Sequence, residues 1–268
     1  MRFLFAMSCL MLAGSVHSQA LAQADTCQSY IGQTLQTQSF DEVWNSLPSV
    51  SPQGEYESNA AYEARIGTLD PRPPVWIRRS TADKQKIGSF DPKIGALKVS
   101  DFALSTYMPF GFGYKLNLPK PSNAFGFAAT DYGRTYDEPY EASNALGAKT
   151  TVTVAVDWID LVIATGNNEK GREWDIPSES YAMKYWNISG TPDRLKEISE
   201  SGNYVWLVAP VKKAGENLRE QTSFAKFNNP VDRSVVAKRV LLADFMCAGL
   251  IDRSGVVLQA SPIKSKRF

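Results

Sequence analysis

The residues best suited to binding chemistry lie in the segment 130–142, which is dense in tyrosines and acids. They are Tyr132, Tyr136 and Tyr140, together with Asp131, Asp137, Glu138 and Glu141. A tyrosine ring offers a large contact area at low entropy cost, which suits glycan or protein recognition. The alternative is an ordinary solvated loop whose tyrosines lie against a sheet. We expect a loop, with Tyr132, Tyr136, Asp137 and Tyr140 as candidate binding residues.

A pair of carboxylates, Asp157 and Asp160, is the main candidate for catalysis. Glycoside hydrolysis needs two acids that flank the scissile bond, and it does not need histidine. The two residues are three apart in a strand-like segment, so a regular strand would place them on opposite faces. Only a bend would bring them together. The alternative, which we favour, is that they kink or end the strand and hydrogen-bond nearby backbone.

Several reaction classes are excluded by what the mature chain lacks. His17 is the only histidine, and it lies in a segment that we expect to be removed. Catalysis by Ser–His or Cys–His pairs is then excluded, as are His-ligated zinc and haem sites. No phosphate-binding or dinucleotide-binding glycine motif occurs in a strand–helix context. The acids of segment 130–142 lack the ligand spacing of an EF-hand, so we expect neither a metal nor a cofactor.

Residues 1–24 have the pattern of a secretory signal peptide. Arg2 precedes an apolar run over residues 3–16, and alanines at 20, 22 and 24 provide two small-x-small cleavage sites. The apolar run is shorter than the ~20 residues that a membrane span needs. We expect cleavage after Ala24, with Ala22 as the alternative. The mature chain would be a single domain over residues 25–268, with a helical N-terminal segment within 25–70.

The charge of the mature chain argues against nucleic acid as a partner. Loss of Arg2 reduces the 29 basic residues to 28, which equals the 28 acidic residues. A nucleic-acid-binding domain usually carries a basic stripe, and interspersed charges of equal number do not provide one. No later run of ~18 apolar residues occurs, so we expect no membrane span after signal cleavage.

Two cysteines, Cys27 and Cys247, remain after cleavage. In an exported protein, such a pair favours one disulfide, here between the N-terminus and a late strand. Closing so long a loop could stabilise the fold by up to ~5 kcal/mol in the chain-entropy model. The alternatives are an unpaired buried thiol or two reactive thiols.

The segment 149–166 is the most strand-like part of the chain and the expected centre of the core. Val152, Val154 and Val156 alternate with threonines and small or polar residues, which is the period of a strand. After Trp158 the apolar bulk moves to the other parity, beginning at Ile159. We therefore expect a bulge or bend at residues 157–160.

Other segments divide into strands and a few short helices. Strands are expected at 74–79, 90–99 with a central turn, 204–211, 223–227, 239–248 and 255–260. Helices are expected after Ser39, after Ser58 or Asn59, at 177–186, and after Thr191. Helices near the front and middle, with mostly consecutive strands elsewhere, predict an α+β fold with a mainly antiparallel sheet.

Short motifs also carry a resemblance. They are Gly54-Glu55-Tyr56-Glu57, Tyr62-Glu63-Ala64-Arg65, Phe90-Asp91 through Val99, Ser143-Asn144-Ala145-Leu146-Gly147, and Cys247 through Val257. Together they resemble uncharacterised exported proteins of Gram-negative bacteria. The resemblance implies a bacterial, envelope-associated protein, and it implies no activity, ligand or catalytic residue.

We therefore expect a periplasmic or secreted protein that is non-catalytic and binds an envelope protein or a glycan. This hypothesis predicts exposed rings at Tyr132, Tyr136 and Tyr140. The alternative is a carboxylate-based hydrolase that acts on an envelope polymer. That hypothesis requires two acids ~5–9.5 Å apart in a cleft.

Overall fold

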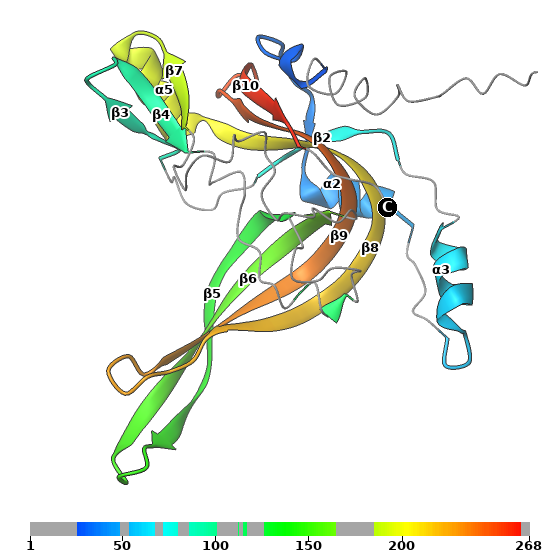
Figure 1. The fold of residues 1–268 in the computed structure, drawn as a ribbon, viewed down its shortest axis with the longest axis vertical. Helices are drawn as coiled ribbons and strands as arrows, with labels where there is room; N and C mark the ends of the chain where they lie inside the picture. The colour runs from blue at the N-terminus through cyan, green and yellow to red at the C-terminus, as the bar shows by residue number, and fades with distance from the viewer. Residues whose placement is uncertain are drawn as a thin grey trace, which may run out of the picture.

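One large and strongly curved sheet dominates the fold (Figure 1). The computed structural model describes residues 26–48, 54–67, 72–79, 86–100, 112, 115–116, 126–164 and 185–263. The strands of this sheet are β1 (Thr37–Gln38), β2 (Val75–Arg78), β5 (Gly126–Ser143), β6 (Lys149–Ala164), β8 (Asn203–Ser223), β9 (Val231–Ile251) and β10 (Val257–Pro262). Their order is β1-β2-β8-β9-β6-β5, and β10 pairs with β9 outside this path. The sheet is therefore built mainly from two long hairpins, β5–β6 and β8–β9.

A smaller three-stranded sheet lies at one end of the molecule, at the upper left of Figure 1. Its strands are β3 (Ser89–Asp91), β4 (Ala96–Ser100) and β7 (Tyr185–Ser189), in the order β3-β4-β7. The described helices are α2 (Phe40–Ser46), α3 (Asn59–Gly67) and α5 (Pro192–Ser201). Helix α5 lies beside the small sheet and leads directly into β8.

The observed fold is mainly β with a mixed sheet, so the expected α+β fold with a mainly antiparallel sheet is wrong. The pairs β6–β9 and β1–β2 are parallel. The segment 130–142, expected as a loop, lies within β5. Tyr185 and Trp186, expected in a helix, lie in β7, and residues 177–184 of that expected helix lie outside the described residues. Residues 224–227, expected in a strand, form the β8–β9 turn instead.

The physical reason for the error in β5 is that its local signals oppose a strand. Gly133 has a φ of 88°, and Pro139 has no N–H for a ladder. The structure places both residues at points where the register between β5 and β6 shifts. Because β5 is the last strand of its sheet path, such bulges are tolerated there. The pairing partner, rather than the local sequence, holds this segment extended.

Strand β6 is covered on both faces from Ile159 onward. On one face, Val162 and Ala164 belong to the largest apolar cluster, which also includes residues of α2, α5 and the small sheet. We call this the α2 face. On the other, called the opposite face, Leu161 and Ile163 join a second cluster around Phe112. The parity change in the sequence therefore marks the point where one buried face becomes two.

The expected irregularity at residues 157–160 is confirmed, but the extra residues belong to the neighbouring strands. Between Ile159 and Asp160, the paired residues of β9 skip Lys238. Between Ile159 and Trp158, the paired residues of β5 skip Tyr132. Strand β6 itself contains no insertion, so its side chains keep alternating between the two faces.

Helices α2 and α5 begin at the predicted capping residues. Ser39 and Glu42 form a capping box, with each side chain accepting a backbone N–H of the other residue. Thr191 caps α5, and Pro192 occupies its first turn, where a missing N–H is harmless. None of the helices in the described residues is long and apolar enough to cross a membrane.

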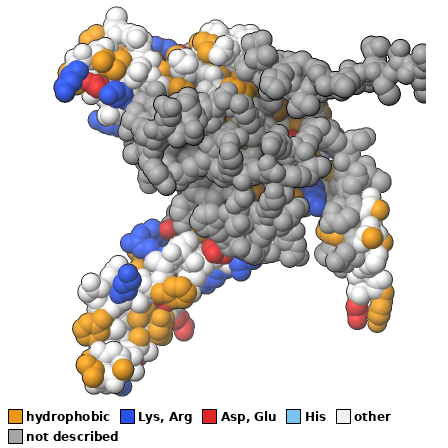
Figure 2. Space-filling view, viewed as in Figure 1, with side chains coloured by type: hydrophobic (Ala, Val, Ile, Leu, Met, Phe, Trp, Pro, Cys, Tyr) orange, Lys and Arg blue, Asp and Glu red, His pale blue; other side chains and the backbone are white. Residues whose placement is uncertain are grey.

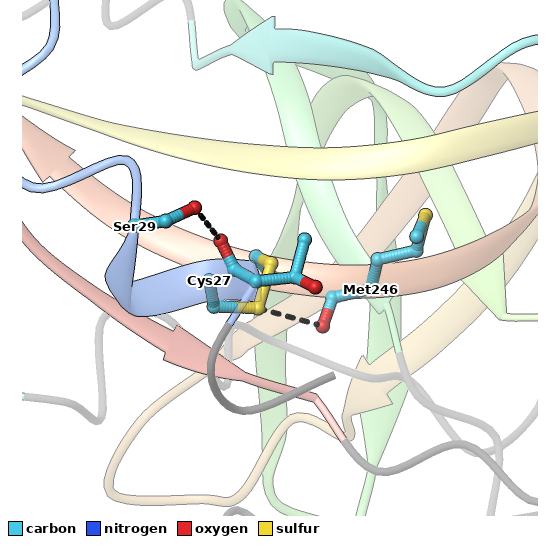
Figure 3. Close-up of a disulfide and its surroundings, with 5 residues drawn as sticks. Cys27, Ser29 and Met246 are labelled. Carbon is cyan, nitrogen blue, oxygen red and sulfur yellow. Dashed lines mark hydrogen bonds between the residues drawn. A yellow bond between two sulfur atoms is a disulfide. The ribbon is translucent and has the colours of Figure 1, made fainter. Parts of the chain in front are cut away.

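The expected disulfide joins Cys27 to Cys247 of β9, with their Cα atoms 5.8 Å apart. Figure 3 shows Cys27 beside Met246, whose carbonyl oxygen is 3.6 Å from Cys27 Sγ. Both cysteines are buried in a third apolar cluster, which includes Trp76 and Val257. The bond therefore fastens the N-terminal segment to the main sheet.

Candidate binding surface on the projecting arm

The far ends of the two long hairpins project together and form what we call the arm. It consists of residues 133–158 of the β5–β6 hairpin and 216–238 of the β8–β9 hairpin. Figure 1 shows these ends at the lower left, away from the small sheet and α5. The parallel β6–β9 pairing begins at Thr153 and Val231, and it joins the two hairpins into one sheet.

An ion pair across the α2 face shows how strongly the arm is rolled. Arg219 Nη1 of β8 lies 2.6 Å from Asp137 Oδ2 of β5, although β9 and β6 separate these strands in the sheet. Asp137 is level with Val154, whereas Arg219 is level with Trp158 through the pairing with β9. In a flat sheet the two backbones would be about 14 Å apart across the strands and about 13 Å along them. The four strands therefore curl until the two edges approach each other.

A second link joins Tyr140 of β5 to Asp232 of β9. The Tyr140 hydroxyl donates to Asp232 Oδ2 at 2.7 Å, and this hydrogen bond raises the pKa of Tyr140. The backbone N–H of Ala225 donates to the other oxygen of Asp232. Because Asp232 is buried, its carboxylate ties the β8–β9 turn to the outer strand of the arm.

A small apolar core fills the rolled arm. Val152 and Val156 of β6 and Val236 of β9 are all buried on the α2 face. Trp158 closes the base of this core, and its Nε1 donates to Thr135 Oγ1 at 2.8 Å. Buried side chains and cross-strand links of this kind raise the free energy of local opening. The arm is therefore an ordered element, and not the loop expected for part of it.

The three candidate tyrosines are exposed, but they do not share one surface. The rings of Tyr132 and Tyr140 are about half exposed, and their hydroxyls donate to Asp160 and Asp232 on the α2 face. Tyr136 pairs with an odd-numbered residue of β6, which places its ring on the opposite face, where it is 66% exposed. The rings are thus exposed as the binding hypothesis predicts, but no continuous tyrosine patch exists. The carboxylate of the candidate residue Asp137 forms an ion pair with Arg219.

Exposed leucine and phenylalanine side chains are found at the two tips of the arm. Leu146, in the β5–β6 turn, is 93% exposed. Phe224 and Phe227, in the β8–β9 turn, are 73% and 65% exposed. Figure 2 shows apolar side chains gathered on the outer part of the arm. Exposed apolar groups that gather on one projection are more informative than scattered ones, because single exposed residues are normal.

Both tips are ordered by hydrogen bonds within the turns. In the β5–β6 turn, Asn144 Oδ1 accepts the backbone N–H groups of Leu146 at 3.0 Å and Ala148 at 2.9 Å. In the β8–β9 turn, Lys226 and Asn229 exchange two backbone hydrogen bonds of 2.9 Å. Several polar backbone groups of each turn are therefore satisfied internally, while the apolar side chains are exposed.

A buried ion pair lies at the base of the arm, on the α2 face. Asp160 is fully buried and accepts Nε and Nη2 of Arg239 at 2.9 and 2.6 Å. The hydroxyls of Thr130 and Tyr132 each donate to Asp160 Oδ2 at 2.6 Å. The hydrogen bonds to Asp160 raise the pKa of Arg239. Burial, together with the bond to Asp160, raises the pKa of Tyr132.

Arg239 also fastens α2 to the sheet. Its guanidinium carbon is 4.9 Å from the ring centre of Phe40 and 5.8 Å from that of Trp44. Its Nη2 is 2.7 Å from Asp41 Oδ1. One guanidinium thus contacts two carboxylates and two aromatic rings. These contacts hold α2 against the sheet, because each of them favours the charged guanidinium in this position.

The two acids considered for catalysis do not converge. Asp160 belongs to the buried cluster on the α2 face, and Asp157 emerges on the opposite face. There Arg134 donates Nε and Nη2 to the two oxygens of Asp157 at 2.6 and 2.9 Å. Both acids are thus structural, although their partners are arginine side chains rather than nearby backbone. Within the described residues, no group of three His, Cys, Asp or Glu side chains could hold a metal ion.

Sequence reasoning identified neither the exposed apolar side chains of the tips as a candidate site nor the Asp160–Arg239 pair. The tip at residues 224–230 contains Asn228-Asn229-Pro230, which is a turn signal that could have separated the two strands. No comparable signal joins Asp160 to Arg239, because they are 79 residues apart in the chain.

Comparison of the chain with models of known protein families, with curated proteins and with solved structures finds no significant match in any of the three. The geometry of the arm is therefore the basis for proposing a function.

Proposed function

We propose that this chain is an exported, non-catalytic binding protein that engages an envelope component, a protein or a glycan, through its arm. The observation that carries the proposal is the placement of exposed apolar side chains on a rigid projection. They are Tyr136, Leu146, Phe224 and Phe227. Exposed apolar groups that gather in one place mark interaction sites. An ordered frame also lowers the conformational cost of binding, because its side chains and turns are already fixed.

The ionised groups of the arm support binding rather than catalysis. Asp157, Asp160 and Asp137 each have a fixed arginine partner, and Asp232 accepts from Tyr140 and Ala225. A catalytic acid and base must instead be free to exchange a proton with a substrate. No observation on the described residues favours the alternative, a carboxylate-based hydrolase of an envelope polymer.

Export is part of the proposal. The disulfide Cys27–Cys247 is of the kind that persists in oxidising compartments, and the first 24 residues have the signal-peptide pattern. The mature protein would begin at Asp25, or at Gln23 with the alternative cleavage site, and would be periplasmic or secreted. Intact-mass measurement of the protein made in a Gram-negative host tests this. A chain that keeps residues 1–24 and stays in the cytoplasm would contradict export.

Site-specific photo-crosslinking tests the role of the arm. A photoreactive phenylalanine analogue replaces Tyr136 or Phe227 in separate variants, and Phe90 in a matched control. Phe90 is also an exposed aromatic residue, but it lies in β3 of the small sheet. We expect a discrete adduct with an envelope protein or glycan from the arm positions and none from Phe90.

The adduct at Phe227 should also disappear when Leu146 and Phe224 are replaced by serine in the same chain. Equal adducts from the arm positions and from Phe90, or an adduct that survives these serine substitutions, would contradict the proposal.

A further inference from the structure

Both tips of the arm combine exposed apolar side chains with exposed cations. Leu146 is followed by Lys149 along the β5–β6 hairpin, and Phe224 and Phe227 flank Lys226 in the β8–β9 turn. Arg233 is exposed a few residues further along β9. The two turns lie at the same end of the molecule in Figure 1. Each tip thus carries exposed apolar side chains in its turn and exposed cations close to that turn.

The exposed side chains at the tips carry a small excess of positive charge once the Asp137–Arg219 ion pair is set aside. Within residues 136–155 and 223–234, which reach the level of Arg233 on each hairpin, the cations are Lys149, Lys226 and Arg233, and the acids are Asp137, Glu138, Glu141 and Asp232. Asp232 is buried and turned inward to Tyr140 and Ala225. Because Asp137 is paired with Arg219, the three exposed cations face two other exposed carboxylates, Glu138 and Glu141. Glu141 lies 3.4 Å from Lys149 Nζ.

From this arrangement we infer that the two tips insert into the surface of an anionic phospholipid bilayer. Leu146, Phe224 and Phe227 enter the boundary between head groups and acyl chains, and the three cations remain at the level of the lipid phosphates. The inference goes beyond the proposed function, because it adds a lipid surface to the protein or glycan that the arm engages.

The shape of the tips favours a lipid surface over a folded protein partner. A stable protein interface buries about 800 Å² on each side, over a continuous and complementary surface. The tips are two separate turns, and each carries only one or two large apolar side chains. Lipids rearrange around separate points, whereas a folded partner would need a matching pocket for each.

The backbone of the tips is also suited to a region poor in water. An unpaired N–H or C=O group is costly in hydrocarbon. The side chain of Asn144 and the paired backbones of Lys226 and Asn229 satisfy polar groups in the two turns. Aromatic rings and long cationic side chains are the residue types that favour membrane interfaces.

Binding through so few groups is weak and reversible, and it depends on charge. Juxtamembrane cations contribute through the negative potential of the lipid surface, and that attraction is screened by salt. The protein should therefore bind vesicles of phosphatidylglycerol and phosphatidylethanolamine, and bind phosphatidylcholine vesicles less. Raising the salt concentration should weaken binding to the anionic vesicles.

Vesicle flotation with the oxidised mature chain tests the inference. In one variant, serine replaces Leu146, Phe224 and Phe227 together. In the matched control, Phe90→Ser removes an exposed ring outside the arm, in β3 of the small sheet. We expect the triple variant to lose about tenfold or more of its partitioning to anionic vesicles, because most of the inserted apolar area is removed. The control should stay within about twofold.

A reporter variant checks insertion directly. In Phe227→Trp, the added indole emission should shift to shorter wavelength on anionic vesicles and be quenched by brominated acyl chains. Equal partitioning of the wild type and the triple variant, or an added emission that neither shifts nor is quenched, would overturn the inference.

The two proposals fail in different ways. If the wild type does not bind vesicles while the photoreactive analogue in place of Phe227 still crosslinks to one protein or glycan, the lipid inference is wrong and the proposed function stands. If neither vesicles nor crosslinks depend on the arm, both are wrong.

Discussion

Asp160 and Arg239 form a buried ion pair at the base of the arm. The carboxylate is fully buried, and the guanidinium contacts it through two nitrogens. Substituting one member of such a pair affects the free energy of unfolding differently from substituting both. Removing one member leaves a buried charge without its partner, which costs about 3–5 kcal/mol, whereas replacing both members by apolar groups is often neutral.

We therefore predict that Arg239→Met lowers the free energy of unfolding by about 3–5 kcal/mol, measured by urea denaturation. The double variant Asp160→Leu with Arg239→Met should recover much of that loss. The matched control is Arg134→Met, which breaks the exposed pair with Asp157 and should cost less than about 1 kcal/mol. Similar losses in Arg239→Met and Arg134→Met would show that burial does not decide the contribution of these pairs.

A second buried carboxylate, Asp252, lies in the turn between β9 and β10. Burial opposes its ionisation, but Ser254, Arg194 of α5 and two backbone N–H groups together hold the pKa of Asp252 below its ordinary value. A lowered pKa in the folded state stabilises the protein above the unfolded-state pKa. That stabilisation is lost as the pH falls through the folded-state pKa, a window below about pH 4.

The prediction for Asp252→Asn is a stability loss at neutral pH that becomes smaller as the pH is lowered below about 4. Urea midpoints of wild type and variant across this range measure it. Asp193→Asn, an exposed acid in the first turn of α5, serves as the control. If the difference between wild type and Asp252→Asn were the same at every pH, the carboxylate would not contribute through its charge.

At the scale of elements, β5 is an edge strand of the ordered arm although its own sequence, with Gly133 and Pro139, disfavours a strand. Its hold on the rest of the arm depends on side chains that cross the sheet, above all Tyr140 to Asp232. An unsatisfied buried carboxylate oxygen costs about 1–3 kcal/mol or more. Loss of the tyrosine hydroxyl should therefore loosen the β8–β9 turn that Asp232 also holds through Ala225.

We predict that Tyr140→Phe accelerates amide hydrogen exchange in residues 224–231 by about 5- to 150-fold, the equivalent of about 1–3 kcal/mol of local stability. Tyr136→Phe is the matched control, because its ring lies on the opposite face of the same strand. Unchanged exchange in Tyr140→Phe, or equal acceleration in Tyr136→Phe, would show that Tyr140 does not hold the turn.

At the scale of the whole molecule, the disulfide joins residues with a sequence separation of 220. Closing a loop of that length restricts the unfolded chain, and the entropy model gives about 5 kcal/mol. Both cysteines also lie in a buried apolar cluster. Breaking the bond therefore affects the unfolded state most, since the cluster can remain packed around two small side chains.

We predict that the double variant Cys27→Ala with Cys247→Ala is less stable by up to about 5 kcal/mol, with a larger dependence of unfolding free energy on urea. The larger slope is expected because the unfolded chain without the bond exposes more surface. The wild type in reductant should behave like the variant. A variant as stable as the oxidised wild type would show that the bond restricts little in the unfolded state.

Features that depend on neighbouring residues or on composition were predictable. The capping box of α2 and the N-cap threonine and proline of α5 act within one helical turn, so the helix starts could be identified at Ser39 and Thr191. The disulfide followed from there being only two cysteines after the expected cleavage. The irregularity near Asp160 was expected from the parity of the apolar residues in β6, although that parity reflects burial of both faces and the extra residues belong to β5 and β9.

Features that depend on distant partners were decided only by the tertiary structure. Strand β5 is extended because β6 pairs with it, against the local preference of Gly133 and Pro139. The sheet is mixed because β9 lies parallel to β6, a pairing that alternation within either strand does not specify. The roles of Asp157 and Asp160 were set by arginines from two other strands. Leu146 and Phe227 became a candidate binding surface only when the fold carried both turns to one exposed end of the arm.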